Sequence, residues 1–123
     1  MMQKEKIEIN PSGKTGSHHW LMQRISALAL LFIGLWLILS IMTIASDPKN
    51  ILPIFFSYPL NVLMGILFIS FALYHGSLGM KVIIEDYINH KFKRHFYVIV
   101  INFLSITSGV AAILAILHLH LIN

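Results

Sequence analysis

Three long runs of apolar residues dominate the chain, and short polar segments separate them. Residues 25–45 contain no charged side chain over 21 positions, residues 60–84 contain only Lys81, and residues 96–121 contain none. A helix needs about 20 apolar residues to cross the ~30 Å hydrocarbon core of a bilayer. The pattern therefore predicts an all-α integral membrane protein with three transmembrane helices over about these ranges.

The segments outside the three runs predict the rest of the organisation. Residues 1–17 are polar and charged, which indicates a flexible tail in front of a three-helix membrane anchor domain at residues 18–123. Residues 51–58 are apolar but contain Pro53, so they predict a loop or a partly embedded connector. Residues 89–95 predict a short basic loop between the second and third helices.

Lysine and arginine are unevenly distributed among these segments. Four precede the first run, four lie in the second loop or at the end of the second run, one lies in the first loop, and none follows the third run. The positive-inside rule places basic segments in the cytoplasm. We therefore predict a cytoplasmic N-terminus, a C-terminus on the opposite side, and Arg24, Asp86 and Tyr87 on the cytoplasmic side.

Composition narrows the possible function classes. The chain is 57% hydrophobic and 11% charged, which is too apolar for an ordinary soluble domain. It has no cysteine, so it cannot supply disulfides, iron–sulfur ligands or a thiol nucleophile. The net charge of +4 would suit a nucleic-acid ligand, but the charges cluster at the ends of the apolar runs instead of forming a basic face. We therefore expect no nucleic-acid partner.

His75 is the principal candidate functional residue, because it lies deep inside the second apolar run. Ionisable side chains in a membrane are costly and usually functional. Gly79, Val82 and Asp86 follow His75 at helical spacing, so they share its face, and Tyr87 lies next to that stripe. A neutral imidazole is a common axial ligand of haem iron. The alternative is a histidine that hydrogen-bonds a neighbouring helix.

Six positions on the first two predicted helices carry a family resemblance: His18, Arg24, His75, Gly79, Asp86 and Tyr87. Together with the three-helix layout, they resemble the D-type, haem-bearing membrane anchor of succinate dehydrogenase (respiratory complex II). The resemblance covers most of the chain from His18 onward. Residues 48–59 and the third run match only in character.

The resemblance implies a function for the chain and for its site residues. His75 would be an axial ligand of haem b, and a second, C-type anchor subunit would supply the other ligand. Flavoprotein and iron–sulfur subunits would bind at the cytoplasmic face. Electrons from succinate would reduce ubiquinone near Tyr87, with Asp86 in the same site. The chain alone would not be a complete enzyme.

Several roles stay open at the level of the residues. Arg24 is either a snorkelling residue that enforces orientation or a cation near a haem propionate or the quinone pocket. Asp86 and Tyr87, without the resemblance, would be ordinary interface anchors. The histidine at position 18 has a neighbour, His19, which leaves the register of the resemblance open there. The two histidines near the end of the third run, His118 and His120, are expected to be interfacial bystanders.

Three other functions are compatible with parts of this pattern. A fumarate reductase anchor would share the fold and the partners but run the reaction in the other direction. A cofactor-free assembly protein of the membrane, or a transporter subunit with His75 on a proton path, would need no haem. The expected location is the bacterial inner (cell) membrane as a multi-pass protein. The mitochondrial inner membrane is disfavoured because the N-terminal segment contains acidic residues and has no arginine before Arg24.

Overall fold

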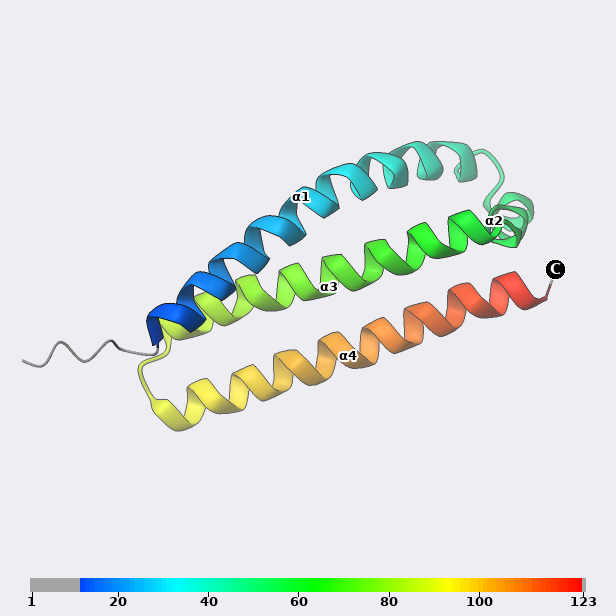
Figure 1. The fold of residues 1–123 in the computed structure, drawn as a ribbon. Coiled ribbons are helices and arrows are strands. Elements are labelled where there is room, and N and C mark those ends of the chain that lie inside the picture. The colour runs from blue at the N-terminus through cyan, green and yellow to red at the C-terminus, as the bar shows by residue number, and fades with distance from the viewer. Residues whose placement is uncertain (1–11, 123) are drawn as a thin grey trace, which may run out of the picture.

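The computed structural model describes residues 12–122, and every element in that part of the chain is helical. The helices are α1 (Ser12–Ile44), α2 (Pro48–Ser57), α3 (Pro59–Tyr87) and α4 (Lys91–Leu121). The three long helices lie side by side, and the short helix α2 turns across one end of the bundle (Figure 1). Helix α3 is central: its backbone packs against both α1 and α4, whereas the backbones of α1 and α4 do not approach each other closely within the described residues.

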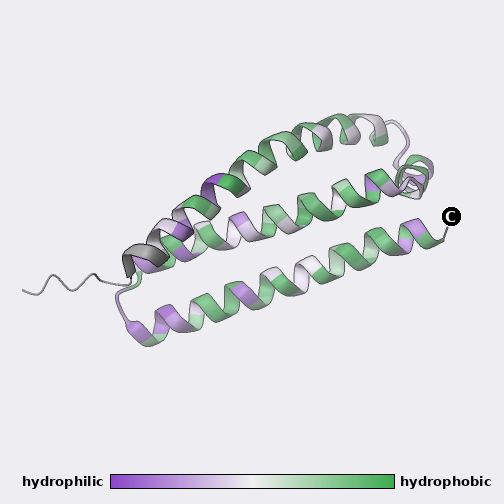
Figure 2. Ribbon diagram, in the orientation of Figure 1, coloured by the Kyte–Doolittle hydropathy of each residue, from purple (hydrophilic) through white to green (hydrophobic). Residues whose placement is uncertain are grey.

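The prediction of three transmembrane helices is confirmed. The helices over Gly16–Ile44, Pro59–Tyr87 and Lys91–Leu121 are each long and apolar enough to cross a membrane. Hydrophobic residues cover most of their length, and hydrophilic ones gather near the helix ends (Figure 2). Large apolar side chains such as Phe32 and Met42 face outward, as expected where hydrocarbon and not water surrounds the helices.

The helices are longer than the predicted spans. Part of the predicted tail, residues 1–11, lies outside the described residues. The remainder, residues 12–17, forms the start of α1, so the first helix begins inside the segment that was predicted to be a tail. Helix α3 continues past residue 84 to Tyr87, which places Asp86 in its last turn.

The connector after the first long helix is also more regular than predicted. Residues 51–58 were expected to form a loop or partly embedded connector, but most of them belong to helix α2. Proline is tolerated in the first turn of a helix, as at Pro48, because the first N–H groups have no intrahelical partner. The helix ends before Tyr58, whose backbone is extended (φ −81°, ψ 123°), because Pro59 disfavours a helical conformation in the preceding residue.

Side chains satisfy main-chain carbonyls at the C-terminal end of α2. The last four carbonyls of a helix have no intrahelical partner, so side chains or water must take that place. Three of these carbonyls accept a side-chain hydrogen bond, in the pairs Ser57–Ile54 (2.5 Å), Asn61–Phe55 (2.9 Å) and His120–Phe56 (2.8 Å). The expectation that His120 is a bystander is therefore wrong, because its Nδ1 links α4 to α2.

Two glycines mark where the helices approach most closely. A Cβ at Gly109 of α4 would lie 3.0 Å from a methyl carbon of Leu73 on α3. A Cβ at Gly65 of α3 would lie 3.1 Å from the Phe56 ring and 3.2 Å from the side chain of Ile116. Small residues at such contacts let helix backbones pack closely, which drives helix association in membranes.

Candidate functional site

A pair of side chains joins α1 to α3 near the middle of the membrane-spanning region. His75 of α3 is half-buried, and Ser26 of α1 is only 1% exposed. The Ser26 hydroxyl lies 2.9 Å from His75 Nδ1. It also donates to the backbone carbonyl of Gln23, one turn earlier in α1, at 3.0 Å. The intramembrane histidine is thus held by a hydroxyl that is itself held by the main chain.

A cavity of about 410 Å³ lies beside this pair, between α1 and α3. Four of the side chains that line it are polar: His19, Gln23, Arg24 and His75. The oxygen Oε1 of Gln23 is buried and has no hydrogen-bond partner within the described chain. No described residue hydrogen-bonds to His75 Nε2, so this nitrogen is the donor atom that the histidine has available. The cavity is therefore lined by an imidazole and a cation, and a glutamine with an unpaired, buried amide oxygen lies in its wall.

Arg24 is exposed at the rim of this cavity and is steadied by an aromatic ring. Its guanidinium carbon lies 5.3 Å from the centroid of the Trp20 ring, which also lines the cavity. Arginine over an indole face gains a cation–π attraction without losing its hydrogen-bond donors. The positive charge therefore stays available to an anionic group next to His75.

The structure brings only some of the predicted site residues together. Arg24 and His75 line the same cavity, with Val82 from the predicted stripe. Asp86 and Tyr87 do not line it; they lie in the last turn of α3, where both are exposed and Tyr87 is 82% exposed. At the start of α1, His19 lines the cavity and His18 does not.

Three residues of this site were missed in the sequence: His19, Gln23 and Ser26. They recur at intervals of four and three residues, so they occupy one face of α1. That spacing is visible in the sequence as a polar stripe that enters the first apolar run. It becomes informative only once the opposing helix is known, because the stripe faces His75.

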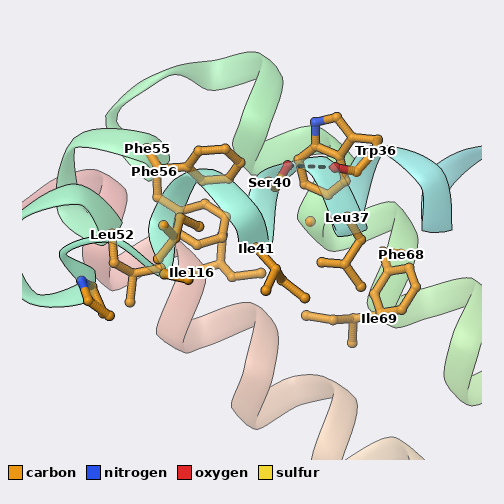
Figure 3. Close-up of a pocket in the computed structure, with 14 residues that line it drawn as sticks. Trp36, Leu37, Ser40, Ile41, Leu52, Phe55, Phe56, Phe68, Ile69 and Ile116 are labelled. Atoms are coloured by element: carbon orange, nitrogen blue, oxygen red, sulfur yellow. Dashed lines mark hydrogen bonds between the residues drawn. The ribbon is translucent and has the colours of Figure 1, made fainter.

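A second cavity of about 450 Å³ lies at the other end of the bundle, where α1, α2, α3 and Ile116 of α4 meet (Figure 3). Its walls are almost entirely apolar, and aromatic rings crowd one side: Trp36 and Phe55 lie 5.8 Å apart between ring centroids. The one hydroxyl on its wall, Ser40, donates to Trp36 O at 2.7 Å. None of the predicted site residues lines this cavity.

A third cavity, of about 440 Å³, lies between α3 and α4. Its polar lining includes Lys81 and a serine–asparagine pair, in which Ser77 Oγ donates to Asn102 Oδ1 at 3.5 Å. The pair belongs to the packing of α3 against α4. His75 and Arg24 lie outside this cavity.

Comparisons with known proteins agree over most of the chain. Residues 9–112 match the family model for the succinate dehydrogenase/fumarate reductase transmembrane subunit. The succinate dehydrogenase hydrophobic membrane anchor subunit of Rickettsia typhi is 36% identical over 113 residues, which are 92% of this chain and 90% of the relative. The corresponding subunit of Rickettsia prowazekii is 40% identical over 111 residues, 88% of this chain and 89% of the relative. No solved structure matches.

Proposed function

The chain belongs to the succinate dehydrogenase/fumarate reductase transmembrane subunit family, and we propose that it supplies one axial ligand of haem b and part of the ubiquinone site of its complex. The relatives and the three apolar helices support a succinate dehydrogenase membrane anchor subunit that is a bacterial multi-pass membrane protein. We place it in the inner (cell) membrane.

The observation that carries the haem proposal is the placement of His75. It is an intramembrane histidine whose Nδ1 contacts Ser26, whose Nε2 has no protein partner among the described residues, and which lines a cavity with Arg24. Within the described chain, no three His, Asp or Glu side chains gather as they would for a bare metal ion. Haem iron needs fewer protein ligands, because the macrocycle supplies the equatorial nitrogens.

The other residues of the cavity fit the same group. Arg24 can pair through its planar fork with a propionate carboxylate, and its contact with Trp20 leaves that fork free. The haem, when bound, would act as a one-electron carrier. This chain would bind it through His75 and orient it through Arg24, with the second axial ligand coming from a C-type anchor subunit.

Tyr87 and Asp86 support the quinone part of the proposal. They end α3, 12 residues after His75 in the case of Tyr87, or about 18 Å along a helix at 1.5 Å per residue. The exposed Tyr87 hydroxyl has no partner among the described residues and can donate to a quinone carbonyl. The Asp86 carboxylate can orient that phenol or pass protons to the quinone as it is reduced.

The partners follow from the same membership. An anchor subunit of succinate dehydrogenase associates with other subunits of the complex. We propose that these are the second anchor, the iron–sulfur subunit and the flavoprotein subunit. The last two would dock at the cytoplasmic face, where α3 ends in Tyr87. The relatives are succinate dehydrogenase subunits, which favours succinate oxidation over the reverse reaction of a fumarate reductase.

Purification of the intact assembly in mild detergent tests the proposal. We expect the flavoprotein, iron–sulfur and second anchor subunits to co-purify with this chain. The preparation should show the spectrum of a low-spin haem b and should reduce ubiquinone with succinate. A preparation with these partners but without haem would overturn the haem proposal. Purification without the partners would favour a cofactor-free assembly or transporter subunit.

A further inference from the structure

We propose that Ser26 is a positioning residue for the haem ligand: it holds His75 as the Nδ1–H tautomer and so presents Nε2 as the atom that binds iron. This rests on the proposed function, because it takes His75 to be the ligand. Ser26 lies on a different helix, 49 residues earlier in the chain, and none of the comparisons assigns it a role.

The proton count of the serine hydroxyl carries the inference. A serine hydroxyl has one proton to donate, and a backbone carbonyl can only accept. Ser26 Oγ lies 3.0 Å from Gln23 O and 2.9 Å from His75 Nδ1. If the hydroxyl donated to Nδ1, its oxygen would face the Gln23 carbonyl without a proton between them. Both contacts are hydrogen bonds only when the hydroxyl donates to the carbonyl and accepts from Nδ1–H.

The tautomer then decides which nitrogen is free. In a neutral imidazole one nitrogen carries the proton and the other carries the lone pair. With Nδ1 protonated, the lone pair is on Nε2, which no described residue contacts by a hydrogen bond. The ring lines the cavity that also holds Arg24. The ligand residue and the cation thus line the same cavity.

The burial of Ser26 makes this arrangement hard to replace. Ser26 is 1% exposed, so neither water nor lipid reaches its hydroxyl in this structure. The chain Nδ1–H to Oγ to carbonyl fixes the plane of the ring and makes the imidazole a stronger electron donor. A stronger donor favours ferric over ferrous iron, so loss of the hydroxyl should raise the haem midpoint potential.

The test compares Ser26→Ala with Ser40→Ala in the purified whole complex. Both serines lie on α1, both are buried, and both donate to a carbonyl of their own helix, but only Ser26 contacts His75, whereas Ser40 lines the apolar cavity at the α2 end. Ser26→Ala should raise the haem midpoint potential, change the electron paramagnetic resonance g values of the ferric haem, and weaken haem retention roughly 10- to 100-fold. Ser40→Ala should leave all three at wild-type values.

Unchanged potential and g values in Ser26→Ala would overturn the proposal. If His75→Ala loses haem while Ser26→Ala keeps wild-type potential and g values, the positioning role of Ser26 is excluded and the proposed function stands. Full haem retention in His75→Ala would instead overturn the proposed function.

A second pair of variants covers failure of Ser26→Ala to assemble. Threonine keeps the hydroxyl at position 26, and valine has nearly the same shape without it. Wild-type potential and g values in Ser26→Thr, with shifted values or lost haem in Ser26→Val, would support the positioning role. The same haem properties in both variants, or no haem in either, would mean that the hydroxyl is not what positions His75.

Discussion

Two histidines of this bundle each contact another helix through Nδ1, one within the membrane-spanning region and one at the α2 end. Within the membrane-spanning region His75 contacts a side-chain hydroxyl, Ser26 Oγ, at 2.9 Å. At the α2 end His120 donates to a main-chain carbonyl, Phe56 O, at 2.8 Å. The bond lengths are alike, but the surroundings differ. His75 lines a cavity with Arg24, whereas the cavity beside the α2 end is almost entirely apolar.

The difference separates a candidate ligand from a structural histidine. The His120 bond satisfies a helix-end carbonyl of α2 that has no intrahelical partner, so the need for that bond comes from the fold itself. The Ser26 hydroxyl already has an acceptor in Gln23 O, so the fold does not need His75 to satisfy it. An intramembrane histidine with one ring nitrogen free of protein partners among the described residues, in a cavity that an exposed cation also lines, is the one to expect in chemistry.

The largest expected effect concerns topology: the α2 end of the bundle and the end of α3 that carries Tyr87 should lie on opposite sides of the membrane. A reporter that is active only outside the cytoplasm, fused after Asn123, should be fully active. The same reporter inserted at residues 88–90, between α3 and α4, should be inactive, because Lys91, Lys93 and Arg94 follow directly at the start of α4. Activity in the reverse pattern would place the α2 end in the cytoplasm. The end of α3 that carries Tyr87 would then lie on the side away from the soluble subunits.

Removing each histidine in turn tests the comparison directly. His75→Ala should abolish or severely reduce the low-spin haem b spectrum of the purified complex, because the proposed iron ligand is gone. His120→Ala should leave that spectrum unchanged, because its bond is to Phe56 O at the α2 end. Haem content per complex, measured from redox difference spectra, decides between them. Equal haem content in the two variants would remove the distinction between the two ends.

Tyr87→Phe tests the proposed quinone contact separately from the haem ligand, because it keeps the ring and deletes one hydroxyl. If that hydroxyl binds the quinone carbonyl, loss of about 0.5–1.5 kcal/mol should lower quinone reduction roughly 2- to 13-fold. Haem content should stay normal, since Tyr87 lies in the last turn of α3 and does not line the His75 cavity.

Two rates measured on one preparation isolate the step that Tyr87 affects. Succinate oxidation with an artificial acceptor that takes electrons from the soluble subunits should match the wild type. Succinate oxidation with ubiquinone should be the slower reaction in the variant. A wild-type rate with ubiquinone would exclude Tyr87 as a quinone-binding residue.

Much of the fold was predictable, because a membrane simplifies the rules. Long uncharged runs can only be spanning helices, so three of the four helices were visible in the sequence. Helix α2 was not, because Pro53 and its short length favour a loop on local grounds. Tertiary contacts support this helix, because Asn61 and His120 satisfy carbonyls at its end. A local sequence pattern cannot predict a hydrogen-bond partner 64 residues away.

The site was predictable only in part, for a related reason. His75 and Arg24 could be singled out because ionisable groups stand out in or beside apolar runs, and the structure places both on one cavity. Ser26 could not, since a lone serine in a transmembrane helix most often bonds to its own backbone, as Ser40 does. Its second contact, to His75, depends on how α1 packs against α3, and the sequence of neither helix alone predicts that register.

The smallest expected effect concerns the stability of the α2 end. His120→Ala leaves Phe56 O without the partner that it has in the wild type, and a net hydrogen bond contributes about 0.5–1.5 kcal/mol. The apparent unfolding temperature of the complex should fall, and proteolysis between α1 and α3 should become faster, because α2 loses its link to α4. His120→Asn should restore much of the loss, since the asparagine amide can donate from nearly the position of Nδ1.

His118→Ala is the matched control: His118 is exposed and its side chain makes no hydrogen bond within the described residues. Equal stability of the His118 and His120 alanine variants would show that the bond to Phe56 O contributes nothing. The α2 end would then owe its order to apolar packing alone, and the contrast between the two histidines would rest entirely on the chemistry at His75.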